Sequence, residues 1–291
     1  MEKLLQNICI YLVSLLILSG LKFHAISMNL ETENFYSKIS KTPEKLIEPT
    51  LSPTPVSLSI DGIRDKVKVV NYNKAAQVPK LKDMKILIVG DSMMQGSVGV
   101  QLEKILSGYG VAGVYRYGKP STGMARPDFF NWDKKLTEIL KVYSPDIAIV
   151  MFGANDGQSI WHDKKWVKIN DPLWEDTYKL KVEQFSTKLY ENKAKYIYWV
   201  GNPICRYDYY SAYMKKINNA LAKYSTERSD FVFVPTWDRF VDSEGKYTNS
   251  MTLSDGSKKI IRSQDGIHFT NDGAKMVVDE VIEKIKINIR F

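Results

Sequence analysis

Apolar and polar positions alternate in two rhythms from residue 84 to the end of the chain. Short apolar runs, typical of strands, occupy residues 84–89, 111–117, 146–152, 196–200 and 231–234. Stretches with apolar residues at helical spacing follow them, at residues 98–106, 129–143, 174–190, 209–224 and 271–287. Asn271 stands where an N-cap of the last helix is expected. Strand followed by helix, five times over, predicts an α/β fold with a doubly wound parallel sheet flanked by helices.

The first 81 residues lack this alternation. Lys3 precedes an apolar run of 14 residues from Ile8 to Leu21. That length fits the core of a signal peptide, about 7–15 residues, and is short of the about 20 that cross a membrane. We interpret residues 1–27 as a signal peptide or signal anchor; a buried core helix is the weaker alternative. Cleavage, and retention with residues 8–21 as a membrane anchor, both remain open.

A proline-containing stretch separates this segment from the regular pattern. Pro43, Pro49, Pro53 and Pro55 lie among Thr, Ser, Glu and Lys, a composition typical of an extended spacer. We therefore divide the chain into a targeting segment (1–27), a spacer (28–81) and a catalytic domain (82–291). Residues 60–81 include several apolar residues that could add either a strand or a helix to the edge of the domain, and their pattern does not decide between the two. Export places the protein in the periplasm or cell envelope, with anchoring by its N-terminus left open.

Composition narrows the class of protein. Hydrophobic residues make up 44% and charged residues 25%, which excludes a disordered chain and a polytopic membrane protein. The net charge of +8 is spread thinly, so we expect no nucleic-acid partner. The two cysteines, Cys9 and Cys205, cannot build a disulfide framework or a four-ligand zinc site. Cys205 is better explained as a small buried hydrophobe than as a nucleophile.

Polar blocks follow several of the predicted strands. They are Gly90-Asp91-Ser92, Ser121 to Asp128, Gly153-Ala154-Asn155-Asp156 and Asp265-Gly266-Ile267-His268. In a doubly wound sheet, ligands bind beyond the carboxyl ends of the strands. We therefore expect the four blocks to meet at one edge of the sheet.

The histidines restrict the chemistry of that edge. A serine hydroxyl becomes a nucleophile when a base takes its proton, and the base is normally a histidine oriented by a carboxylate. Of the three histidines, His24, His162 and His268, only His268 has an acidic residue three positions earlier, Asp265. We predict Ser92 as the nucleophile, His268 as the base and Asp265 as the residue that orients the base.

Acyl transfer also needs donors for the oxyanion that forms on the carbonyl oxygen. The backbone N–H groups of Ser92 and Gly123 and the side-chain amide of Asn155 are the candidates. Each block taken alone has a simpler alternative, a helix cap or a turn. The hypothesis therefore depends on the blocks lying together.

These blocks resemble the motifs of the SGNH/GDSL hydrolase family, whose four letters correspond to Ser92, Gly123, Asn155 and His268. The resemblance covers residues 84–291, with Gly-Asp-Ser-Met in place of the usual Gly-Asp-Ser-Leu. Residues 119–132 are similar to an uncharacterised, exported bacterial branch. The resemblance implies a flavodoxin-like five-stranded sheet, esterase or lipase chemistry, and no metal or organic cofactor. The family includes enzymes that add or remove O-acetyl groups on envelope polysaccharides.

Three more side chains are candidates for binding the substrate. Arg126 could hold a carboxylate or phosphate, or pair with Asp128. Trp161 and Trp174 suit stacking on a sugar ring, although core packing is the better explanation for such residues. His162 could be a rival base or a substrate contact, but an exposed loop residue is the better explanation.

These observations predict a serine esterase or O-acyltransferase that forms an acyl-enzyme and acts on short O-acyl groups of an envelope carbohydrate or another small ester. One alternative is a catalytically silent carbohydrate-binding or scaffold protein of the same fold. The presence of serine, asparagine and histidine together argues against it. The other is a lipase acting on membrane lipid, which the Trp-, Tyr- and Lys-rich loops disfavour.

Overall fold

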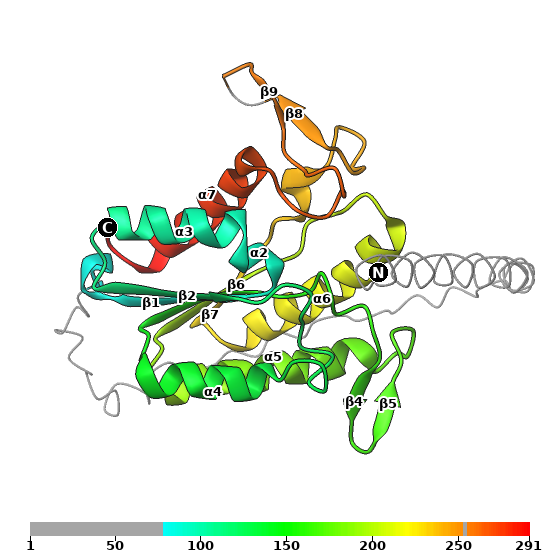
Figure 1. The fold of residues 1–291 in the computed structure, drawn as a ribbon, viewed down its shortest axis with the longest axis horizontal. Coiled ribbons are helices and arrows are strands. Elements are labelled where there is room, and N and C mark those ends of the chain that lie inside the picture. The colour runs from blue at the N-terminus through cyan, green and yellow to red at the C-terminus, as the bar shows by residue number, and fades with distance from the viewer. Residues whose placement is uncertain (1–77, 253–254) are drawn as a thin grey trace, which may run out of the picture. The chain divides into compact units, whose positions relative to one another are not determined.

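Five parallel strands form the central sheet (Figure 1). In this computed structural model, which describes residues 78–252 and 255–291, they are β1 (Lys85–Gly90), β2 (Gly113–Gly118), β3 (Ile147–Met151), β6 (Tyr196–Val200) and β7 (Phe231–Val234). Their order is β2-β1-β3-β6-β7. The sheet therefore grows in both directions from β1, which is the flavodoxin-like order. The predicted fold class is confirmed.

Helices cover both faces of the sheet (Figure 1). One layer holds α2 (Ser92–Gln95), α3 (Ser97–Gly108) and α7 (Asn271–Asn288), and the other holds α4 (Trp132–Val142), α5 (Trp174–Glu191) and α6 (Asp208–Glu227). Because both faces are covered, the central strands are apolar throughout: every residue of β3 is buried. Each fully buried Ile or Leu stabilises this core by about 1.5–3 kcal/mol.

Short elements complete the described part of the chain. Two antiparallel hairpins pair β4 (Ile160–His162) with β5 (Lys165–Val167), and β8 (Ser250–Thr252) with β9 (Lys258–Ile260). Two 3-10 helices, η1 (Leu81–Asp83) and η2 (Trp237–Phe240), lie before β1 and after β7. At the start of the domain, the N–H of Leu81 donates to the carbonyl of Arg290, so its two ends meet.

Two predicted helix starts need correction. The helix expected from residue 129 begins at Trp132, because Asn131 accepts from the N–H of Lys134 and caps it there. The predicted cap Asn271 is wrong, since it is the first residue inside α7. The preceding Thr270 is the cap, and its hydroxyl accepts from the N–H of Gly273.

The described residues belong to the second of two units, residues 72–291. The predicted targeting segment, most of the predicted spacer, Cys9 and His24 lie outside the described residues. Within residues 78–252 and 255–291, no helix has the length and apolar character needed to cross a membrane.

β1 ends at the edge of the sheet where the sequence predicts that the polar blocks meet. A Cβ atom at Gly90 would lie 2.1 Å from the carbonyl oxygen of Met151 on β3. Glycine is therefore required for the two strands to approach so closely. The next two residues, Asp91 and Ser92, emerge at the point where the chain connections diverge, which is where ligands bind in such sheets.

Candidate active site

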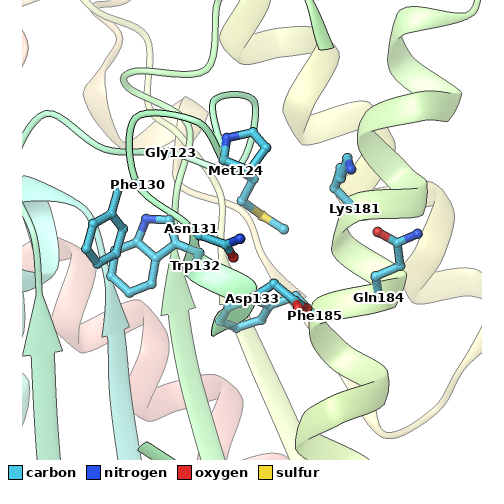
Figure 2. A pocket seen from close by; sticks show the side chains of 10 residues that line it. Gly123, Met124, Phe130, Asn131, Trp132, Asp133, Lys181, Gln184 and Phe185 are labelled. Atoms are coloured by element: carbon cyan, nitrogen blue, oxygen red, sulfur yellow. The ribbon is translucent and has the colours of Figure 1, made fainter. Parts of the chain in front are cut away.

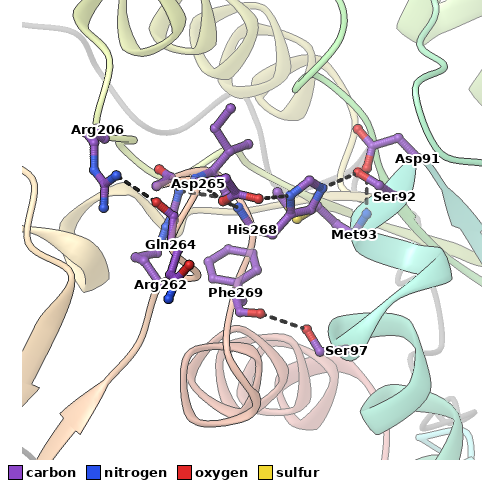
Figure 3. A network of polar contacts seen from close by, with 12 residues as sticks. Asp91, Ser92, Met93, Ser97, Arg206, Arg262, Gln264, Asp265, His268 and Phe269 are labelled. Atoms are coloured by element: carbon purple, nitrogen blue, oxygen red, sulfur yellow. Dashed lines mark hydrogen bonds and ion pairs between the residues drawn. The ribbon is translucent and has the colours of Figure 1, made fainter. Parts of the chain in front are cut away.

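A chain of two short hydrogen bonds joins Ser92, His268 and Asp265 (Figure 3). The Oγ of Ser92 lies 2.8 Å from Nε2 of His268, and Nδ1 of His268 lies 2.7 Å from Oδ2 of Asp265. Ser92 is the first residue of α2, whereas the other two lie on the loop between β9 and α7. The fold thus brings together side chains 176 positions apart in the order that base-assisted nucleophilic attack requires.

Hydrogen bonds within a tight turn orient Asp265 towards His268. Its Oδ1 accepts from the backbone N–H groups of Ile267 and His268, at 2.8 and 2.9 Å. Gly266, which lies between Asp265 and Ile267, has a φ of +71°, a conformation that favours glycine. Partial burial pushes the pKa of Asp265 upwards, but the hydrogen bonds from the His268 ring and the two N–H groups outweigh it and lower the pKa to about 2. Asp265 therefore stays ionised at neutral pH, as a partner of an imidazolium must.

Asn155 and Gly123 are held side by side. The Nδ2 of Asn155 donates to the carbonyl of Thr122 at 2.9 Å, which uses one of its two amide hydrogens and leaves the other for a ligand. Gly123 lies against the carboxyl group of Asp156, and a Cβ at this position would be 2.1 Å from its Oδ1. The predicted oxyanion donors Gly123 and Asn155 are thus part of one packed loop pair.

Asp156 is a site residue that the sequence analysis passed over as part of a turn. It is completely buried and accepts from the N–H of Ala125 and from the hydroxyl of Tyr178, both at 2.8 Å. Burial raises its pKa to about 6, although these hydrogen bonds act in the opposite direction. Asp156 therefore fastens the loop of Gly123 to α5. Its place directly after Asn155 was the only signal for it in the sequence.

A second buried carboxyl group, Asp91, directly precedes Ser92. Its Oδ1 accepts from the N–H of Met93 at 3.0 Å and caps α2, but Oδ2 has no hydrogen-bond partner within the described part of the chain. Burial is the main cause that raises the pKa of Asp91 to about 7, and the charge of Asp156 adds to the rise. A buried carboxyl group that lacks a hydrogen-bond donor for one oxygen is stabilised in its protonated form, because its surroundings have a low dielectric constant.

Arg262 supports the loop that carries Asp265 and His268, and nothing in the sequence pattern pointed to it. It is 2% exposed, and Nη2 donates to the carbonyls of Gly266 and Ile267, at 3.4 and 2.8 Å. The rings of Phe240 and Phe269 lie 5.3 and 4.7 Å from its guanidinium carbon. Burial lowers the pKa of Arg262 to about 10. The side chain remains charged at neutral pH and holds the turn that carries His268.

The structure gives the predicted substrate contacts Arg126 and Trp174 other partners than a substrate. Arg126 makes a bidentate ion pair with Asp128 and donates to Gln158, so the ion-pair alternative is the one observed. Trp174 is completely buried and stacks on Tyr178, which corrects its prediction as a substrate contact: it is a core residue.

The β4–β5 hairpin carries Trp161 and His162 on the side of the molecule where α4 and α5 lie (Figure 1). Trp161 is exposed and contacts Trp166 across the hairpin, with ring centroids 5.2 Å apart. Neither residue lines the cavity beside Asn155 described below. The hydrogen bond to Ser92 belongs to His268 rather than to His162.

Two cavities adjoin the loops of the site. One of about 170 Å³ lies behind Gly123, between Trp132 and the α5 side chains Lys181 and Phe185 (Figure 2). The other, of about 310 Å³, is open to solvent and has Asn155 in its wall. Among residues 78–252 and 255–291, no three His, Cys, Asp or Glu side chains are grouped as metal ligands would be.

Several solved structures are similar to this chain. They include a GDSL-like lipase from Bacteroides thetaiotaomicron (14% identity, TM-score 0.47, covering 72% of this chain and 91% of that one). An acetylxylan esterase from Geobacillus stearothermophilus, solved as a catalytic mutant, has 15% identity and a TM-score of 0.49 over 69% of this chain and 94% of that one. A family 3 carbohydrate esterase from Clostridium thermocellum has 15% identity and a TM-score of 0.47, over 70% and 96%.

No curated protein matches the sequence. A family model described as "Protein of unknown function (DUF459)" matches residues 85–284, from the start of β1 into α7. The match to a family of unknown function and the observed five-stranded parallel sheet agree with the predicted uncharacterised branch and its predicted fold class. The matched range includes every residue that builds the site described above, and the chain belongs to the DUF459 family.

Proposed function

We propose that this protein is a serine esterase that removes short O-acyl groups from a carbohydrate, or transfers them to an acceptor hydroxyl, through an acyl-enzyme. The observation that carries the proposal is the hydrogen-bonded chain from Ser92 through His268 to Asp265. Its distances match those of an activated nucleophile, its base and the residue that orients the base.

In the first half of the reaction, the Oγ of Ser92 attacks the carbonyl carbon of the ester. Nε2 of His268 takes the hydroxyl proton, and the ionised Asp265 stabilises the imidazolium through Nδ1. The tetrahedral intermediate then collapses: the bond to the sugar oxygen breaks, and His268 returns the proton to that leaving oxygen. The products of this half are a free sugar hydroxyl and an acyl ester on Ser92.

In the second half, water or an acceptor hydroxyl replaces the sugar oxygen. His268 takes the proton of the incoming group as its oxygen attacks the acyl carbon. Collapse of this intermediate breaks the bond to Oγ, and His268 gives its proton back to Ser92. Water yields the free acid, whereas an acceptor hydroxyl yields a new ester, so one site accounts for both hydrolysis and transfer.

Both intermediates place a negative charge on the former carbonyl oxygen. We assign its stabilisation to the N–H groups of Ser92 and Gly123 and to the free amide hydrogen of Asn155. Asp156 supports this assignment, because it holds the Gly123 loop in a fixed position before any substrate arrives. Such preorganised donors are most effective when they need no rearrangement during the reaction.

We also propose that the reaction takes place outside the cytoplasm, in the periplasm or cell envelope. This rests on residues 1–27 and 28–81 as targeting segment and spacer, which lie outside the described residues. Cleavage of residues 1–27 or their retention as an anchor is decided by N-terminal sequencing of the mature protein. An envelope ester would then be the acyl donor.

The test is ester hydrolysis by the full chain and by its Ser92→Ala variant, with p-nitrophenyl acetate and p-nitrophenyl palmitate. We expect acetate to be the better substrate and the variant to be inactive. Preference for palmitate would favour the lipase alternative. A folded wild-type protein that turns over neither ester and is not labelled by a fluorophosphonate would favour the silent carbohydrate-binding alternative.

A further inference from the structure

The open cavity beside Asn155 has a wall of tyrosines. Tyr209, Tyr210 and Tyr213, from the first turns of α6, line it together with Ser121 and Gln158. The ring centroids of Tyr209 lie 5.8 Å from Tyr210 and 5.5 Å from Tyr213, and those of Tyr210 and Tyr213 are 5.5 Å apart. Tyr209 is 60% exposed, so a large aromatic surface faces solvent next to the proposed oxyanion donor.

This wall is tied to both loops of the site. The hydroxyl of Tyr209 donates to the carbonyl of Gly157 at 2.8 Å, and that of Tyr213 donates to the carbonyl of Ala154 at 2.7 Å. The two acceptor residues, Ala154 and Gly157, flank the Asn155–Asp156 turn. On the other side, the N–H of Arg206, just before α6, donates to the carbonyl of Gly266 in the catalytic loop at 3.1 Å. The tyrosines therefore keep a fixed position relative to Asn155 and His268.

The cavity lining contains no charged side chain. The nearest cation in its hydrogen-bond network, Arg126, donates to the side chain of Gln158 but is already paired with Asp128. The buried carboxyl group of Asp156, directly after Asn155 in the chain, is mostly ionised at neutral pH and opposes the approach of a second negative charge. Hydroxyl and amide groups beside exposed aromatic rings match a neutral ligand with both an apolar face and hydroxyls.

From this juxtaposition we infer that the tyrosine-lined cavity is the subsite for the alcohol part of the ester, and that this part is an uncharged sugar ring. The inference rests on the proposed esterase function and deepens it. The CH face of the ring packs against the tyrosine wall, and the sugar hydroxyls bond to Ser121, Gln158 and the hydroxyl of Tyr210. A uronic acid at this position meets no cation that could neutralise it.

The test uses two substrates that differ in one group. Methyl glucoside and methyl glucuronide, each carrying one acetyl ester at the same ring position, differ only in a neutral CH₂OH against a carboxylate. p-Nitrophenyl acetate, which has no sugar, reports on the acyl-transfer machinery alone. We expect the full-length wild type to prefer the glucoside over the glucuronide by about tenfold or more in kcat/KM, the scale of one aromatic contact or one unpaired charge.

Variants of Tyr209 then separate stacking from loop support. Tyr209→Ala should lower kcat/KM for the glucoside about tenfold more than for p-nitrophenyl acetate. Tyr209→Phe keeps the ring but loses the hydrogen bond to Gly157, and should retain most of the sugar preference. Tyr109→Ala is the matched control, because Tyr109 is an exposed tyrosine at the end of α3, beside the amino ends of the strands. Melting temperatures identify any variant that misfolds.

The outcomes separate this inference from the proposed function. A preference for the glucuronide, or an equal loss on all substrates in Tyr209→Ala, would overturn the subsite while Ser92-dependent hydrolysis of p-nitrophenyl acetate leaves the esterase proposal intact. If no ester is cleaved, the esterase proposal fails, and calorimetric binding of methyl glucoside decides the subsite alone. Binding that Tyr209→Ala weakens supports it, and absence of binding overturns it.

Discussion

Two aspartates flank the Ser92–His268 pair, and their environments are opposite. Asp265 is about half exposed and receives three hydrogen bonds, which lower its pKa to about 2. Asp91 is buried and has an oxygen without a partner in the described residues, and its pKa rises to about 7. Burial and the supply of hydrogen-bond donors, and not proximity to the serine, thus determine which carboxylate is reliably charged at neutral pH. Only Asp265 is suited to stabilise an imidazolium.

The largest expected effect distinguishes these two aspartates directly. Asp265→Asn should lower kcat by about 10⁴-fold at neutral pH, because an amide nitrogen facing Nδ1 imposes the wrong tautomer on His268. Asp91→Asn keeps an acceptor for Met93 and should have a much smaller effect on kcat. Steady-state kinetics on p-nitrophenyl acetate measures both. Similar losses of kcat in the two variants would contradict the different roles of the two aspartates.

Loss of the Asn155 amide should have the next largest effect. Asn155→Ala removes one preorganised donor, and we expect kcat to fall by about 10²–10³-fold with little change in KM. The melting temperature controls for the lost hydrogen bond to Thr122. A variant with altered KM and unchanged kcat would show that Asn155 binds the substrate in its ground state instead.

Variants of Arg262 test whether the loop that carries Asp265 and His268 needs support from the core. Arg262→Met removes the donor to the Gly266 and Ile267 carbonyls, and displacement of His268 should lower kcat by up to about 10²-fold. The rate of fluorophosphonate labelling should fall with it, and Arg262→Lys should restore part of both. Arg239→Met is the matched control, since Arg239 is an exposed arginine paired with Glu280. A loss of thermal stability with kcat and labelling unchanged would assign Arg262 a structural role only.

The smallest effect concerns stability against pH. The pKa of Asp91 is raised from 3.8 to about 7 on folding, so its contribution to stability is fully present below pH 3.8 and is lost as the pH rises through about 7. Asp91→Asn cannot titrate, and should flatten this part of the pH dependence of the melting temperature. Asp156 remains as a titrating group with a pKa of about 6. Identical pH profiles for the two proteins would mean that folding does not raise the pKa of Asp91.

Elements with a strong local signal were predictable from the sequence. Buried runs such as residues 146–152 identified the central strands, and the four polar blocks contained Ser92, Asn155 and His268, the candidate site residues. The roles of Asp156 and Arg262 were not predictable, because each depends on partners that only the fold brings close. Trp161 and Trp174 show the same limit: both are tryptophans after the Asn155 turn, yet one is exposed on a hairpin and the other is completely buried.

The esterase proposal depends most directly on activation of Ser92 by His268. Reaction of the full chain with a fluorophosphonate, followed by peptide mapping, measures this. We predict a single adduct on Ser92, absent in Ser92→Ala, strongly slowed in His268→Ala and unaffected in His162→Ala. An adduct on another serine in Ser92→Ala, or a labelling rate that depends on His162 and not on His268, would contradict the account.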